Sequence, residues 1–183
     1  MEELPVPWYP RVMQFALRLV RKTMESVLRD GELPDRPAII PQELQGIRTG
    51  TYVVAYERLG RKPRGCVGSY LPTKPSLAEE IVYQTTRLLE TFPFRKDELG
   101  DLRFELQLTK PPALLADLDE LKSHAGLLVR TSLGKAGVAL PFSDEARPAD
   151  RFRDACTQGN IDPITDDIRL YTFAVERIAD KVV

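Results

Sequence analysis

Two β-forming runs flank a basic turn in Thr51-Tyr-Val-Val-Ala-Tyr-Glu-Arg-Leu-Gly-Arg-Lys-Pro-Arg-Gly-Cys-Val-Gly-Ser-Tyr-Leu71. The first run, Thr51 to Tyr56, is rich in β-branched and aromatic residues, and the second extends from Arg64 to Leu71. Between them, Glu57 to Lys62 contains a glycine and several basic residues. Two such runs separated by a short glycine-containing segment are typical of a β-hairpin. We therefore predict a hairpin with a basic tip.

Helical periodicity occurs on both sides of this hairpin. From Pro10 to about Asp30, apolar residues recur at steps of three and four, with Gly31 just past the end, which predicts an amphipathic helix with suitable boundaries. The segment Ser76-Leu-Ala-Glu79 fits a capping box, so a second helix is expected from Ser76 to about Glu90. A short helix is expected near residues 149–158.

The remaining regular segments are predicted to be strands. Residues Arg103 to Lys110 alternate polar and apolar side chains, which predicts a half-buried strand with one apolar face: Phe104, Leu106 and Leu108. Residues 126–130 and 137–140 suggest a second hairpin, and 169–176 a final strand. Strands joined by hairpins together with separate helices indicate an α+β fold with mainly antiparallel pairing.

Length and composition set limits on the function. The 183 residues favour one domain spanning 1–183, and 43% apolar with 29% charged residues is ordinary for a soluble globular protein. The net charge of -1 argues against general, charge-driven binding of nucleic acids. An acidic start and the absence of a long apolar run predict a cytoplasmic protein without membrane association. Two cysteines and one histidine are too few for a zinc site, so neither a metal nor a cofactor is expected.

The most informative motif is Arg64-Gly-Cys-Val-Gly-Ser69. Glycines within a strand indicate a bulge or a close backbone approach, and basic residues near a thiol favour the nucleophilic thiolate. One hypothesis is therefore an enzyme or enzyme component in which Cys66 is the reacting thiol and Arg64 stabilises a thiolate or anionic group. The backbone of the neighbouring residues would bind an oxyanion or phosphate; these candidates are Gly65, Val67, Gly68 and Ser69.

The motif is also consistent with other functions. Cys66 fits a small packing residue, as most free cysteines are, in a non-catalytic module that binds a protein partner through the same cleft or the exposed hairpin. A weaker alternative is nucleic-acid binding through the basic hairpin. Cys156 falls at helical spacing with Phe152 and Ala155 and is expected to face the core. His124 is read as a structural or exposed residue rather than an acid/base group.

The motif Pro63-Arg-Gly-Cys-Val-Gly-Ser69 resembles the Leu-Arg-Gly-Cys-Ile-Gly hallmark of the AMMECR-one family. The resemblance covers about Val12 to Asp180, leaving residues 1–9 as an N-terminal extension. Further similar segments follow in the family's order: Gly50-Thr-Tyr-Val-Val54, Pro75-Ser-Leu77, Asp97-Glu-Leu99, Ala125-Gly-Leu-Leu-Val129 and Gly137-Val-Ala-Leu-Pro141. The chain departs from the family pattern at Pro63, Leu89 to Phe94, Phe142-Ser143 and after Cys156. These departures mark a divergent member and alter any family site to which the residues belong.

What the resemblance implies is an α+β fold with an antiparallel, partly barrel-like sheet, and a glycine-cysteine motif close to a cleft. It implies no known reaction. Family members are associated with Memo-type and radical-SAM proteins, which suggests a partner of that kind within a shared modification system. Function must still be argued from the site.

Overall fold

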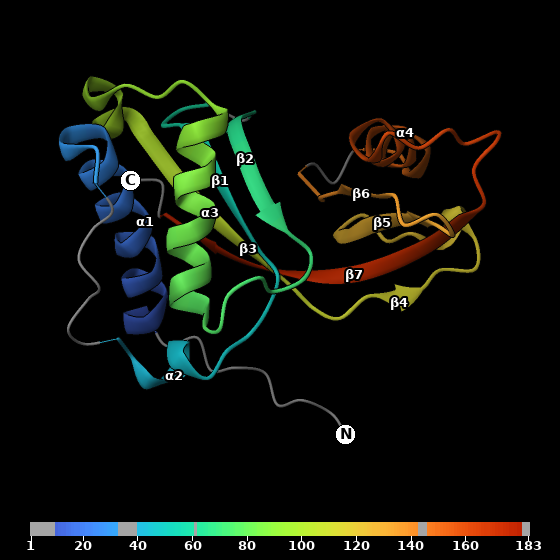
Figure 1. Cartoon of the computed structure of the whole chain (residues 1–183), viewed down its shortest axis with the longest axis horizontal. Helices are drawn as coiled ribbons and strands as arrows, with labels where there is room; N and C mark the ends of the chain where they lie inside the picture. Colours follow the sequence, from blue (N-terminus) through green and yellow to red (C-terminus); the bar gives the residue numbers. More distant parts are fainter. Residues whose placement is uncertain (1–9, 33–39, 61, 143–145, 181–183) are drawn as a thin grey trace. The chain divides into compact units, whose positions relative to one another are not determined.

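A computed structural model describes residues 10–32, 40–60, 62–142 and 146–180 (Figure 1). The chain forms two compact units, the first made of residues 1–108 and 177–183 and the second of residues 109–176. Both contain helices and antiparallel strands, which confirms the α+β prediction.

Two long helices of the first unit begin and end near the predicted residues. Helix α1, Pro10–Asp30, buries an apolar stripe consisting of Val12, Ala16, Leu17, Leu19, Val20 and Met24. Helix α3, Leu77–Thr91, is capped by Ser76, whose Oγ accepts the backbone N–H of Glu79 at 3.3 Å. The short α2, Gln42–Gln45, and the 3-10 helix η1, Lys96–Asp101, were not predicted, since neither is long enough to show a period.

The sheet of the first unit contains the predicted hairpin. Strands β1, Thr51–Glu57, and β2, Pro63–Ser69, pair antiparallel, and β3, Leu102–Thr109, pairs with the other edge of β1. In this register Val53 lies between Val67 and Leu106, and Val54 lies between Cys66 and Glu105. Because side chains alternate along a strand, these two rows point to opposite faces of the sheet.

One face of this sheet packs against α1 and α3 and forms the apolar core of the unit. The strands contribute Val53, Ala55, Val67, Phe104, Leu106 and Leu108, and the helices contribute residues such as Val20, Met24, Ile81 and Leu88. In Figure 1 both helices lie on the same side of β1, β2 and β3. We call this the apolar face.

Strand β3 departs from its prediction of one polar, solvent-facing side. Glu105 is 8% exposed and Gln107 is fully buried, so the strand is buried on both faces. Strict alternation predicts which residues share a face, but it does not reveal whether the polar side meets water.

The loop between β2 and α3 is fixed by a buried carboxylate. Glu80, 1% exposed on α3, accepts the backbone N–H groups of Thr73 and Lys74, each at 2.7 Å. The same carboxylate accepts the Thr73 hydroxyl and the Gln84 side-chain amide at 3.0 and 2.7 Å. The route from the end of β2 to the start of α3 is thus set by one side chain.

The second unit contains the second predicted hairpin, β5, Ala125–Thr131, with β6, Ala136–Ala139. Strand β7, Ile168–Ala179, pairs with β5 and is longer than predicted. Its residues from Arg177 onward belong to the first unit. The short strand β4, Ala113–Leu114, pairs with β7, and η2, Leu118–Glu120, follows; neither was predicted.

Helix α4, Pro148–Gly159, lies close to the residues predicted for it. Its Ala155 and Cys156 are buried in the apolar cluster that also contains Leu127 and Val129, so the prediction that Cys156 faces the core is confirmed. Within the described ranges, the helices are too short or too polar to cross a membrane.

Candidate functional site

Arg64 is held by groups that follow α3, away from the thiol with which it was expected to cooperate. Its guanidinium donates to the carboxylate of Glu98 at 3.1 Å and to the carbonyl of Pro93 at 3.0 Å. It also lies over the ring of Phe94, 5.3 Å from the centroid. The pKa of Glu98 is lowered, chiefly by its hydrogen bond from Arg64. Arg64 therefore anchors the start of η1 to β2.

The two glycines of the motif leave room for aromatic rings of the same unit. A Cβ at Gly65 would come within 3.0 Å of the Phe92 ring, and a Cβ at Gly68 would overlap the ring of Tyr52. Val67 between them points into the apolar core. The close approach that the glycines predict is thus made by side chains within the fold.

Cys66 lies on the opposite face of β2 from Val67 and is half-buried. Burial, with a smaller contribution from the negative charge of Glu105, raises the pKa of the Cys66 thiol to about 12. The direction is opposite to that of an activated cysteine. Arg58 and Lys62 of the hairpin are exposed, and Arg61 lies outside the described residues.

The thiol shares its face with buried polar side chains, which we call the polar face: Tyr52, Tyr56, Cys66, Glu105 and Gln107. The Gln107 side-chain N–H donates to Glu105 Oε1 at 2.6 Å, whereas Gln107 Oε1 is buried and has no hydrogen-bond partner in the described structure. A buried acceptor without a partner is costly, and such groups often mark a site that is completed by a ligand.

The tyrosines of the polar face are held in their neutral form. Burial raises the pKa of Tyr56 to about 12, with Glu105 contributing, and burial raises the pKa of Tyr52 still further. Arg103 lies over the Tyr56 ring at 4.0 Å from the centroid, and Arg177 Nε lies 3.9 Å from Glu105 Oε1. The face therefore combines an anionic acceptor with aromatic walls and cations at its rim.

The remaining predicted positions have local roles. Ser69 Oγ donates to the carbonyl of Leu71 at 2.5 Å and accepts its N–H at 3.3 Å, which turns the chain at the end of β2. His124 is exposed. Across the described ranges, no three His, Cys, Asp or Glu side chains gather as ligands for a metal ion.

Sequence reasoning placed the motif but missed Glu105 and Gln107. Both alternate with core residues in a strand whose polar side was expected to be exposed. A glutamate and a glutamine two positions apart, and so on the same face of the strand, were the available signal, but only the register places them on the face that carries Cys66.

Curated relatives share the sequence over most of the chain. A protein of Thermotoga maritima is 29% identical over 170 residues, covering 90% of this chain and 95% of that protein. Protein Ta0236 of Thermoplasma acidophilum is 31% identical over 137 residues, covering 69% of this chain and 64% of that protein. The match to protein CA_C1420 of Clostridium acetobutylicum, 29% identical, covers 68% of this chain but 27% of that protein.

A solved structure has the same fold. It is the crystal structure of the uncharacterized protein PH0010 from Pyrococcus horikoshii, with a TM-score of 0.78 and 22% identity, covering 91% of this chain and 90% of that one. The profile of the AMMECR1 family matches residues 17–178. With this match over most of its length, the chain belongs to the AMMECR1 family.

Proposed function

We propose that the chain is a non-catalytic interaction module whose polar face binds a cationic or hydrogen-bond-donating group of a partner. In this proposal Cys66 stays a neutral thiol that fills space in the same row as Glu105, with Val54 between them. The motif has a structural task, because Arg64, Gly65 and Gly68 fit β2 against η1, α3 and Tyr52.

The observation that carries the proposal is the buried, unpartnered Gln107 Oε1 beside the Glu105 carboxylate. Both groups accept hydrogen bonds, and a guanidinium or ammonium group supplies several donors and a positive charge. Tyrosine rings beside the carboxylate favour a cation further. A ligand would reach this face from the β2 side, where Cys66, Gly68 and Ser69 are only partly buried.

The state of the thiol supports binding over catalysis. With a pKa of about 12, Cys66 carries no negative charge near neutral pH. Arg64 is committed to Glu98 and Pro93 instead of stabilising a thiolate.

The partner is proposed to be a Memo-type or radical-SAM protein, as the family resemblance implies. The Clostridium relative supports a component role, because the matched region is 27% of a longer protein. We also infer a cytoplasmic location, where the free thiols of Cys66 and Cys156 would stay reduced.

A second contact with this partner is proposed at the end of the β1–β2 hairpin. Leu59 is 92% exposed there, between the exposed Arg58 and Lys62. The turn is held by an N–H from Arg58 to the Asp101 carbonyl at 2.7 Å and by Arg103 donating to the Gly60 carbonyl at 2.9 Å. An apolar side chain on a turn of fixed backbone, flanked by cations, is complementary to a protein surface with an apolar patch and acidic residues.

The polar face is tested by NMR titration of the full chain with ethylguanidinium. We expect the side-chain amide signals of Gln107 to shift saturably, and Glu105→Gln to abolish that shift while Glu57→Gln, an exposed glutamate of β1, leaves it unchanged. Calorimetry with a purified Memo-type protein tests the partner. Cys66→Ser is expected to retain binding within about twofold, and Glu105→Gln to weaken it about tenfold or more. No response of Gln107 would overturn the proposal.

The alternative function is an enzyme component with Cys66 as the reacting thiol, which would have to form a thiolate against the effects of burial and of the Glu105 charge. Alkylation of Cys66 against pH, in a Cys156→Ser background, separates the two functions. Slow alkylation that rises only in strong alkali supports the interaction module. Fast alkylation titrating below about 8.5 supports the enzyme.

A further inference from the structure

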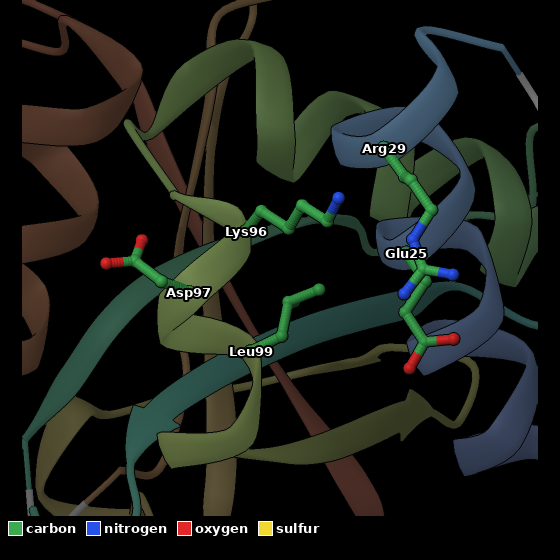
Figure 2. Close-up of a pocket in the computed structure, with 5 residues that line it drawn as sticks. All are labelled: Glu25, Arg29, Lys96, Asp97 and Leu99. Atoms are coloured by element: carbon green, nitrogen blue, oxygen red, sulfur yellow. The ribbon is translucent and has the colours of Figure 1, made fainter.

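A charged hollow lies on the first unit between the C-terminal end of α1 and η1. Its volume is about 500 Å³, and its lining is Glu25 and Arg29 from α1 with Lys96, Asp97 and Leu99 from η1. Figure 2 shows Lys96 extending from η1 toward α1, Arg29 running along α1 in the direction of Glu25, Leu99 pointing into the hollow and Asp97 pointing away.

The η1 side of the hollow is held in place by ion pairs. Glu98 accepts from Arg64 at 3.1 Å and from the backbone N–H of Arg95 at 3.2 Å. Leu99 packs against the apolar core of the unit. The backbone that carries Lys96 is therefore positioned before any ligand arrives, which lowers the entropic cost of binding.

The lining of the hollow has two cations and two anions, but one of the anions is already paired. Asp97 is paired with Arg95 at 3.3 Å, so its charge is balanced outside the hollow. In the described part of the chain, Arg29 and Lys96 have neither an ion-pair nor a hydrogen-bond partner. Glu25 is the remaining anion of the lining. The negative end of the α1 dipole accounts for a cation at Arg29, but it does not account for a second cation brought from η1.

We propose that this hollow is a binding site for a small molecule carrying at least two negatively charged oxygens, as in a phosphorylated or polycarboxylated metabolite. One oxygen pairs with the Arg29 guanidinium, which suits the geometry of a phosphate or carboxylate, and another pairs with the Lys96 ammonium. Leu99 contacts an apolar part of the ligand. This site is separate from the polar face, and its test is independent of the proposed function.

Isothermal titration of the full chain with pyrophosphate and with citrate, at constant ionic strength, tests the proposal. We expect saturable binding of at least one of the two anions, and Arg29→Gln and Lys96→Gln each to weaken it about five- to tenfold. Glu25→Gln is expected to tighten binding, because it removes the anion that competes with the ligand. A preference for pyrophosphate identifies a phosphorylated ligand, and a preference for citrate identifies a polycarboxylate.

Matched controls come from the second unit. Arg130 and Lys122 are exposed cations there, so Arg130→Gln and Lys122→Gln are expected to leave the affinity unchanged. A second measurement uses the unaltered chain, in which pyrophosphate should protect Lys96, but not Lys122, from amine acylation mapped by mass spectrometry. No saturable binding of either anion, or an equal loss in the control variants, would overturn the proposal.

Discussion

The two faces of the β2-β1-β3 sheet are both buried, but they are built from opposite chemistry. The apolar face meets α1 and α3 with residues such as Val53, Val67 and Leu106, none more than 8% exposed. The polar face carries a carboxylate, an unpartnered amide oxygen and phenols at similar burial, together with a half-buried thiol. Hydrophobic burial on the first face supplies stability, whereas the second face retains groups that stability alone would disfavour. This difference is the reason for placing the proposed function on the polar face.

The largest effect is expected from truncating the apolar face. Phe104 is 1% exposed and contacts the core between the sheet and α1. Phe104→Ala should lower the free energy of unfolding by about 3–5 kcal/mol, through lost burial and the cavity left behind. The urea midpoint at unchanged m-value measures this. The control is Phe142→Ala, a side chain 41% exposed, and a loss below about 1 kcal/mol at Phe104 would contradict the role assigned to this face.

The next effect falls where β2 meets the polar face. Gly68→Ala places a Cβ against the Tyr52 ring and should cost about 1–3 kcal/mol by overpacking. Tyr52→Leu in the same chain should recover part of that loss. Gly100→Ala is the matched control, because no atom lies within 4 Å of the added Cβ. Equal losses at both glycines would show that backbone freedom, rather than the ring, requires Gly68.

A smaller effect is expected at the helix that covers the apolar face. Ser76→Ala removes the acceptor for the Glu79 N–H at the start of α3 and should cost about 1 kcal/mol in thermal or urea unfolding. Ser132→Ala, in the exposed turn between β5 and β6, is expected to change stability by less than about 0.5 kcal/mol. Indistinguishable values for the two serines would argue against the cap.

The effect that is smallest at neutral pH concerns the thiol, because it appears only in alkali. The pKa of Cys66 is about 12 in the fold against an ordinary value of 9.0, so the unfolded chain releases the proton first as the pH rises. Stability due to the neutral thiol is therefore complete below about pH 9 and is lost progressively toward pH 12. Unfolding curves from pH 7 to 10.5 should show a steeper decline for the unaltered chain than for Cys66→Ala. Parallel curves would mean that the thiol ionises normally.

Much of the fold follows from local patterns. The period of α1, the cap at Ser76 and the β-branched run at Thr51 predict elements that the structure confirms. The elements missed, α2, β4, η1 and η2, are too short to show a period. Their existence depends on contacts that are distant in sequence, which a window of residues does not contain.

The site was less predictable, and Glu105 shows why. In the sequence it is one polar residue in an alternating strand, and such residues usually face water. Only the pairing of β3 with β1, and of β1 with β2, brings Glu105 into the row of Cys66. Arg64 illustrates the reverse case, in which closeness in sequence misleads. It is two residues from Cys66 in the sequence, but its side chain pairs with Glu98 in the fold.

The carboxylate of Glu80 has a consequence for how this chain tolerates change. Four hydrogen bonds from Thr73, Lys74 and Gln84 converge on it, so the loop after β2 has one permitted length and path. An inserted residue there would separate the buried charge from its donors on Thr73 and Lys74, which is a costly change to a fold. We therefore expect natural variation and engineered insertions to avoid the loop at Thr73.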